Sequence, residues 1–202
     1  MRGYRRARYK AGKPATTAPN RLRQVFAASA PDEAWVTDIT QIHTHEGWLY
    51  LAAVIDFYSR AVLGWSIHGH IRTALVLDAM LMAKWRRQPK QSVVIHSDQG
   101  SQFGSDAFNR WWKENNFITG ISRRGNCYDN AAIESFWNHL KKEKTRGKIY
   151  NTREELKAEI FDYIEVFYNK VRSHSYLNYL SPVQFEQQQF VHWYLSMLLG
   201  EV

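Results

Sequence analysis

The chain has 202 residues, 45% of them hydrophobic, and a formal net charge of +8. This length suits one main domain with short extensions, and the apolar content excludes a chain that is disordered throughout. The single cysteine, Cys127, excludes an internal disulfide and a zinc site made of cysteines, and it favours a reducing compartment.

The positive charge is concentrated at the N-terminus. Residues 1–24 contain eight Lys or Arg and no acid, whereas the rest of the chain carries 19 basic and 19 acidic residues. Such an arm suits a polyanion such as nucleic acid, because contacts with phosphates need charge and no base-specific geometry. The alternative is a solvated tail that aids solubility.

No segment of the sequence has the length of a membrane span. The longest late apolar stretch, residues 190–199, is interrupted by His192 and Ser196, and its ten residues fall short of the roughly 20 that a spanning helix needs. The basic N-terminus also lacks the apolar region of a secretion signal. We therefore expect a protein of the cytoplasm with no membrane partner.

The first elements form a run of strands. Residues 1–31 are expected to be irregular, since they contain three prolines and few periodic apolar positions. Residues 35–42, 48–57 and 62–67 are rich in β-branched and aromatic residues and predict three strands. The short turns between these strands predict an antiparallel arrangement.

Helices and further strands follow. Thr73 is expected to cap a helix, residues 93–95 predict a strand that is apolar on both faces, and residues 117–121 predict a fifth strand. Apolar residues recur at helical spacing after Thr73, namely Leu77, Met80, Leu81 and Trp85. Between the last two strands, Ser105 is expected to cap a helix that carries Phe108, Trp111 and Trp112 on one face.

Two more helices complete the pattern. Asn130 is expected to cap a helix that starts at Ala131, and Thr152 with Glu155 forms a capping box for the next helix. The buried stripe expected on that last helix is Leu156, Ile160, Ile164 and Phe167. The whole order predicts an α/β fold with a mixed five-stranded sheet, three antiparallel strands followed by parallel additions, flanked by helices.

Three carboxylates stand in unusual positions. Asp38 lies inside an apolar strand, Asp98 follows the C-terminal end of another strand, and Glu134 lies early in a helix. Each has an ordinary explanation: a residue at the rim of the sheet, a turn residue, and a favourable partner for the helix dipole. Together, carboxylates from two strands and a helix could converge to hold divalent cations.

The chemistry of such a cluster points to phosphodiesters. Mg²⁺ prefers oxygen ligands, and no cluster of His and Cys competes for a softer metal. Two ions can activate an attacking oxygen and stabilise a leaving one in phosphodiester displacement. The chain lacks the G-x-S-x-G elbow and a catalytic cysteine pattern, which argues against acyl transfer.

The segments around the three acids resemble a known family. Asp98 and Glu134 have the spacing of the DDE motif of retroviral integrases and many bacterial transposases. The flanking segments are more specific: residues 35–40 (WVTDIT), 54–60 (VIDFYSR), 96–103 (HSDQGSQF), 122–136 (SRRGNCYDNAAIESF), 167–169 (FYN) and 180–182 (LSP). Over about residues 2–187 the chain resembles the OrfB-type catalytic subunit of insertion-sequence transposases, which has an integrase core.

The resemblance implies an RNase H-like fold, in agreement with the order of strands and helices. It implies that Asp38, Asp98 and Glu134 are the catalytic, metal-binding acids, that two Mg²⁺ ions serve as cofactor, and that Mn²⁺ can substitute. The implied reaction is hydrolysis at the end of an element, which frees a 3′-hydroxyl, and attack of this hydroxyl on another phosphodiester. DNA is then the partner, at element ends and at the target, and a homo-oligomer is expected in the DNA complex.

The resemblance also divides the chain. Residues 1–31 are expected to be a basic arm left from an upstream DNA-binding region, residues 32–187 the catalytic core with a C-terminal helix, and residues 188–202 an unassigned tail. Members of the family usually carry a helical DNA-binding segment upstream, so an upstream-frame partner or fusion is expected. The expected location is the bacterial cytoplasm, in association with the nucleoid.

Basic residues near the acids are candidates for DNA contacts. They are Arg123, Arg124, Lys141 and Lys142, with Arg5 and Arg6 in the arm. Lys141 shares a helix face with Glu134 and Asn138, since these follow at helical spacing; the alternative is a solvated face. Asp56 is expected to serve a turn with Ser59 or Arg60 rather than a metal, and His96 to be a core or hydrogen-bonded histidine.

Three functions fit the sequence. The leading one is DNA strand transfer, which the family-specific segments favour. A nuclease of the same fold would only hydrolyse. A truncated, inactive or domesticated DNA-binding remnant is the non-enzymatic alternative, although all three acids are present.

Overall fold

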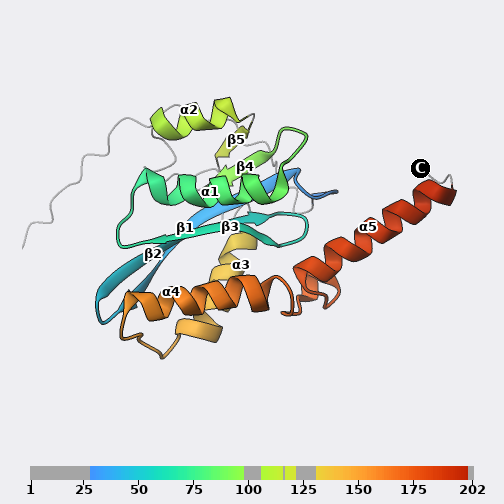
Figure 1. Cartoon of the computed structure of the whole chain (residues 1–202). Coiled ribbons are helices and arrows are strands. Elements are labelled where there is room, and N and C mark those ends of the chain that lie inside the picture. Colours follow the sequence, from blue (N-terminus) through green and yellow to red (C-terminus); the bar gives the residue numbers. More distant parts are fainter. Residues whose placement is uncertain (1–27, 98–105, 116, 122–130, 200–202) are drawn as a thin grey trace, which may run out of the picture.

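The computed structural model describes residues 28–97, 106–115, 117–121 and 131–199 (Figure 1). Several residues singled out from the sequence lie outside these ranges: Arg5, Arg6, Asp98, Ser105, Arg123, Arg124 and Asn130. The expectations that concern them therefore stay predictions.

Within the described residues, five strands form one sheet in the order β3-β2-β1-β4-β5. The strands are β1 Ala34–Thr44, β2 Gly47–Asp56, β3 Val62–His68, β4 Val94–Ser97 and β5 Ile118–Ile121. β1, β2 and β3 pair in antiparallel fashion, whereas β4 joins β1, and β5 joins β4, in parallel. The predicted mixed five-stranded sheet is confirmed.

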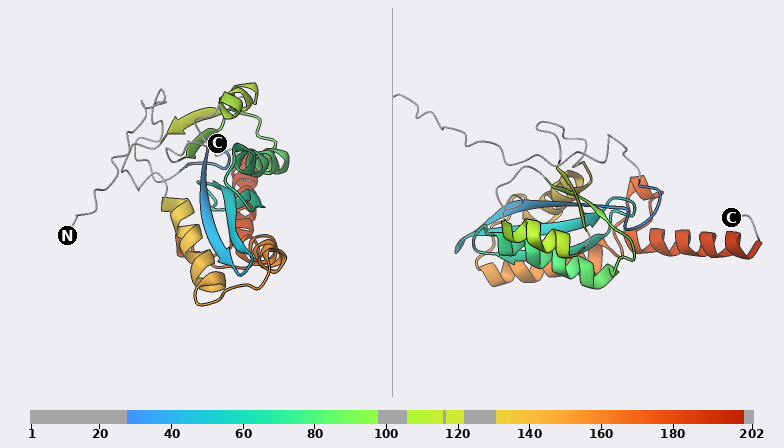
Figure 2. Two further views of the ribbon diagram at one scale, coloured as in Figure 1. Left: turned by 90° about the vertical axis from the view of Figure 1, so that its left-hand side faces the viewer. Right: turned by 90° about the horizontal axis from the view of Figure 1, so that it is seen from above.

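Helices cover both faces of this sheet, with α1 on one face and α3 on the other (Figure 2). The helices are α1 Thr73–Arg87, α2 Asp106–Glu114, α3 Ala131–Leu140, α4 Arg153–Phe161 and α5 Pro182–Leu199. Two π-helical segments, Lys141–Thr145 and Asp162–Tyr168, continue α3 and α4, and a short 3-10 helix spans Ser175–Leu177.

The alternation of side chains along a strand explains the two cores. On β1, Trp35 belongs to the core under α1, while Ala34 and Val36 belong to the core under α3 and α4. On β2, Ala52 and Val54 likewise face α1, and their sequence neighbours face α3. Because both faces are covered, apolar residues of β1 and β2 are buried on both sides of the sheet.

The first helix differs from its predicted face. Arg72 rather than Thr73 is the N-cap, and its side chain makes no capping hydrogen bond. Leu81 is 37% exposed and Trp85 74% exposed. Met80 is buried as predicted, and the face that packs on the sheet otherwise consists of Leu75, Val76, Ala79 and Ala83. Ala79 and Ala83 lie where α1 comes close to β3 at Gly64, a position at which a Cβ would overlap the backbone of α1.

The capping box of α4 is present in a modified form. The backbone N–H of Glu155 donates to Thr152 Oγ1 at 3.0 Å, as predicted. The Glu155 carboxylate, however, accepts from the backbone N–H of Asn151 rather than from that of Thr152. Both contacts satisfy amide groups at the start of the helix that have no partner within it.

The buried stripe of α4 is predicted correctly except at its end. Leu156, Ile160 and Ile164 are buried, but Phe167 is 38% exposed and Tyr168 takes the inward position. The cause is the π-helical segment Asp162–Tyr168, since a wider turn shifts the next inward position by about one residue. Prediction with a regular helical period places the stripe one residue too early.

The C-terminal part of the chain forms one long helix. α5 extends away from the sheet (Figure 1) and runs without a break through the 187/188 position at which the unassigned tail was expected to begin. Most apolar side chains on its outer half are at least about half exposed, for example Phe190, Trp193 and Leu198. The described part of residues 188–202 is thus helical and carries a large apolar surface.

Candidate active site

Asp38 lies in the middle of β1, opposite Ala53 on β2. Ala34, Val36 and Ile42 pack on the α3 side of the sheet, and the alternation of side chains places Asp38 on this side too. Its carboxylate meets α3 directly, because the indole Nε1–H of Trp137 donates to Asp38 Oδ2 at 3.0 Å. A partly buried carboxylate in an apolar strand is thereby supplied with a donor.

Glu134 lies in the first turn of α3 and is exposed. The opposite side of the helix is buried through Ala132, Ile133, Phe136, Trp137 and Leu140. This division confirms the predicted faces, since Glu134, Asn138 and Lys141 are all exposed. Residues three apart in a helix are neighbours on its surface, so Glu134 stands beside Trp137, the residue that reaches Asp38.

The third acid, Asp98, lies outside the described residues. The strand that leads to it is described, and β4 runs parallel to β1 with Ser97 paired to Thr37. Ser97, the residue before Asp98, is therefore the neighbour in the sheet of Thr37, the residue before Asp38. His96, one position earlier on β4, is fully buried, as expected for a core histidine.

Asp56 is a structural acid, as the sequence predicts. It is fully buried at the end of β2, where Oδ2 accepts from the backbone N–H of Ser59 at 2.8 Å and from the Ser59 hydroxyl at 2.9 Å. Oδ1 accepts from the backbone N–H of Asp32 at 3.0 Å. Burial raises the pKa of Asp56 to about 6, although these hydrogen bonds act in the opposite direction. Both carboxylate oxygens of Asp56 thus accept hydrogen bonds from Ser59 and Asp32.

A basic groove adjoins the continuation of the helix that carries Glu134. Lys141, Arg146 and Lys148 line a hollow of about 600 Å³ together with Gln41 and His43 of β1. Lys148 also lies 3.9 Å from Glu159, and Lys144 is paired with the same Glu159 at 2.6 Å. Lys142 is exposed on the same segment.

Among the described residues, no group of three or more His, Cys, Asp or Glu side chains could hold a metal ion. Asp98 is not part of that set, so the predicted trio is represented by Asp38 and Glu134 alone. Both offer carboxylate oxygens, the ligands that Mg²⁺ prefers. In the part of the chain that the structure describes, no helix is both long and apolar enough to cross a membrane.

Trp137 is a residue whose role sequence reasoning missed. The apolar stripe of α3 predicts that it is buried, which is correct at 6% exposure. The direction of its N–H depends on the angle at which α3 crosses β1. No local sequence pattern predicts that crossing angle. The only available signal is its position three residues after Glu134.

The fold places the described part of the chain in a structural class. The mixed sheet and its covering helices resemble the catalytic cores of retroviral integrases. Among the solved structures that match, the catalytic core domain of BIV integrase has a TM-score of 0.56 and 16% identity, covering 81% of this chain and 99% of that one. The HTLV-2 integrase catalytic core domain in complex with magnesium has a TM-score of 0.54 and 15% identity, covering 78% and 98%. The predicted RNase H-like fold is confirmed.

Sequence comparison identifies the family. Two integrase core domain models match residues 28–127 and 134–190. The transposase InsF for insertion sequence IS3fB of Escherichia coli is 46% identical over 84% of this chain and 59% of its own length. The transposase for insertion sequence element IS904 of Lactococcus lactis is 40% identical over 91% and 73%. The chain belongs to the insertion-sequence transposases with an integrase core, and it spans 59% of the length of the Escherichia coli relative.

Proposed function

We propose that this chain is the catalytic core of a transposase that cuts DNA and joins the freed end to a second DNA site. The observation that carries the proposal is the Trp137–Asp38 hydrogen bond, because it fastens the strand of the first acid to the helix of Glu134 within an integrase-core fold. The relatives with 40–46% identity are named as transposases.

The metal would be held by Asp38, Asp98 and Glu134. Their oxygens suit Mg²⁺, and Mn²⁺ can substitute for it. A bound pair of ions supplies activation of the attacking oxygen and stabilisation of the leaving oxygen. The HTLV-2 integrase core of the same fold is described in complex with magnesium, which supports this assignment. Within the chain, Trp137 fixes one oxygen of Asp38, so the other oxygen has a defined direction.

The reaction has two steps that balance without a redox partner. A water oxygen bonds to phosphorus at the element's end while the bond to the 3′-oxygen breaks, and the oxygen leaves as a 3′-hydroxyl. This hydroxyl then bonds to a phosphorus of target DNA, and the bond between that phosphorus and its own 3′-oxygen breaks. Neither step requires a nucleophilic side chain.

DNA would lie across the basic groove beside α3. Lys141 is exposed on the same side of the helix as Glu134, and Lys142 follows it. Arg123 and Arg124 precede the helix, and Arg5 and Arg6 belong to the arm. Contacts of this kind hold phosphates and carry no base information.

The chain would act as a homo-oligomer on DNA, with an upstream-frame partner or fusion that recognises element ends, in the bacterial cytoplasm at the nucleoid. The exposed apolar side chains of α5 support self-association, because a second copy offers the same surface and an isologous contact buries both. Light scattering of the DNA complex measures this directly. A measured mass that corresponds to a single protein chain in the DNA complex contradicts self-association.

The function is tested with a nicked duplex that already carries the 3′-hydroxyl of an element end. The full chain is incubated with this DNA and a labelled target, with Mg²⁺ or with EDTA. The proposal predicts joined product only with Mg²⁺. Target cleavage without joined product identifies a nuclease, and no product under either condition identifies an inactive remnant.

A further inference from the structure

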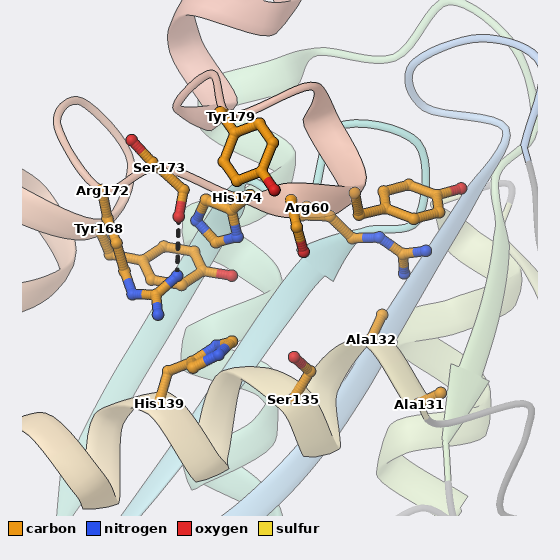
Figure 3. Close-up of a pocket in the computed structure, with 12 residues that line it drawn as sticks. Arg60, Ala131, Ala132, Ser135, His139, Tyr168, Arg172, Ser173, His174 and Tyr179 are labelled. Atoms are coloured by element: carbon orange, nitrogen blue, oxygen red, sulfur yellow. Dashed lines mark hydrogen bonds between the residues drawn. The ribbon is translucent and has the colours of Figure 1, made fainter.

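A cavity of about 440 Å³ lies beside the helix that carries Glu134 (Figure 3). One wall is α3 itself, through Ser135 and His139. The opposite wall comes from the loop between α4 and α5, through His174 and Tyr179, and from Arg60 in the turn after β2. Figure 3 shows the side chains of α3 pointing across the cavity toward this second wall. Among the described residues that line it, neither Asp38 nor Glu134 is present.

Three buried polar atoms of residues that line this cavity have no hydrogen-bond partner among the described residues. Arg60 Nη1, His139 Nδ1 and His174 Nε2 are buried and make no hydrogen bond with the described residues. His174 as a whole is only 8% exposed. Buried polar atoms usually have partners, because an unmade hydrogen bond costs free energy. A small shift of the side chains around them would let a ligand in the cavity supply the missing partners.

The walls are largely aromatic. The rings of His139 and His174 stand at 90° with centroids 6.3 Å apart, and Tyr168 lies edge-on to His174 at 4.8 Å. The guanidinium of Arg60 lies 4.1 Å from the centroid of the Tyr176 ring. Tyr179, at the rim, is 75% exposed. Flat rings and a guanidinium plane are the surfaces on which unpaired bases stack.

The described lining of the cavity combines cationic and neutral side chains. None of the described residues that line it is acidic, and Arg60 and Arg172 supply the positive charge. The nearby Glu143 is held by Arg172 at 2.8 Å and by the Tyr163 hydroxyl at 3.0 Å. Burial lowers the pKa of His139, and that of His174 to about 4, so both rings are neutral at pH 7 and offer hydrogen bonds.

The backbone of the walls is unusual as well. Arg60, Asn178 and Tyr179 have φ angles of 63°, 55° and 64°, a left-handed conformation that residues other than glycine rarely adopt. Three of the five such residues in the described chain thus lie at or next to this cavity. Strained backbone of this kind persists where the surrounding structure enforces it, and it often accompanies a binding site.

We propose that this cavity holds one unpaired nucleotide of the DNA substrate. Its base stacks on the exposed rings of Tyr176 and Tyr179 and bonds to His139 and His174, and its phosphate lies on Arg60. The size of the cavity is that of a small-ligand site, and its wall on α3 places the nucleotide near Glu134. The inference rests on the proposed function, which identifies the bound polymer as DNA. It adds a second site for that DNA on the protein.

The test is binding in EDTA, which is independent of cleavage. The probe is a duplex with a short single-stranded overhang that contains 2-aminopurine, and the matched probe is the same duplex with a fully paired end. We expect the full chain to bind the overhang more tightly and to quench its fluorescence, as stacking requires. Wild-type protein that does not distinguish the two probes overturns the proposal.

Two variants locate the effect. Tyr179→Ala removes a stacking ring, and Ser135→Leu fills the cavity from an exposed position on α3. Each is expected to weaken overhang binding by roughly ten-fold or more and to abolish quenching, with paired-end binding unchanged. Trp85→Ala removes an equally exposed ring from α1 and serves as the matched control. Variants that bind the overhang like wild type overturn the site, whereas loss of Mg²⁺-dependent joining with intact overhang binding bears only on the proposed function.

Discussion

Trp137 belongs to the hydrophobic core and also contacts an acid of the proposed active site. Its ring is buried against Phe136, with centroids 4.8 Å apart, and its N–H ends on the Asp38 carboxylate. A hydrogen-bond donor that contacts a metal-binding carboxylate fixes the orientation of that carboxylate and affects its affinity for the metal. The residue therefore acts on the proposed site through Asp38, as a positioning residue.

Trp137→Phe tests this role. The variant keeps an aromatic ring in the core but loses the N–H, so we expect the Mg²⁺ concentration that supports half-maximal joining to rise by about 10- to 100-fold. Urea unfolding should show a smaller loss of stability than a Trp→Ala change would give. Trp85→Phe, at a side chain that is 74% exposed, is the control. A Trp137→Phe protein with normal Mg²⁺ dependence contradicts the positioning role.

The buried Asp56 predicts a pH dependence of stability. Its pKa is about 6 in the folded chain and near 3.8 when unfolded, so between these values the folded state holds a proton that the unfolded state has lost. The free energy of unfolding should thus fall by about 2 kcal/mol from this group as pH rises from 4 to 6. Asp56→Asn removes the titration. Unfolding midpoints of both proteins across this range should diverge accordingly, and parallel curves contradict the assignment.

At the level of residues, sequence reasoning finds ionisable groups more readily than their partners. Asp56 is assigned to a turn correctly because Ser59 follows at the spacing of a local turn. The bond from Trp137 to Asp38 joins residues 99 positions apart and depends on the crossing of α3 over β1. The cavity wall built by Arg60 and His174 has the same origin, since no local pattern links these residues.

The elements show where periodicity fails. Strands are predicted within about two residues because both faces are covered and the apolar runs are long. The helix faces are less certain, because Phe167 is displaced by a π-helical turn. On α1 the buried side includes Ala79 and Ala83, whereas the large residues Leu81 and Trp85 are exposed, so residue size is a misleading guide where a helix lies close to a sheet.

Gly64 makes that close approach possible. A Cβ at this position would lie 2.1 Å from the Ala79 carbonyl oxygen and 2.5 Å from the Ala83 amide nitrogen. Because both atoms belong to the backbone of α1, the helix would have to move. We expect Gly64→Ala to destabilise the protein by at least about 1–3 kcal/mol in urea unfolding. Gly69→Ala meets only the flexible side chain of Arg153 and should cost little; equal effects of the two changes contradict the account.

For the whole molecule, the sequence predicts the architecture well and the surface poorly. Strand type and order along the chain indicate an antiparallel meander with parallel additions, since chain connectivity limits how such elements can pair. The apolar stretch of residues 190–199 is visible in the sequence, but its exposure is not. That exposure follows from the long helix α5, which extends away from the sheet (Figure 1).

The basic arm supplies a prediction at this scale. Deletion of residues 1–24 removes eight positive charges and no negative ones. We expect DNA affinity to fall and the slope of log affinity against log salt to become shallower, with sequence preference unchanged. Fluorescence anisotropy over a range of salt concentrations measures all three quantities. An unchanged slope shows that the arm does not contact phosphates.

The most direct test of the central claim is Glu134→Gln, assayed for Mg²⁺-dependent joining and for thermal unfolding in EDTA on one preparation. Gln keeps the size and helix propensity of the side chain but loses the charge that holds a cation. The account predicts that joining is abolished while DNA binding persists, and that the thermal midpoint stays level or rises as repulsion among the acids is relieved. Glu154→Gln, at an exposed acid in the first turn of α4, should leave joining unchanged and lower the thermal midpoint slightly, because it loses only a helix-dipole contact and a surface ion pair. A Glu134→Gln protein that joins DNA normally and loses about 0.3–1 kcal/mol of stability would show that Glu134 serves only the helix dipole, and would contradict the account.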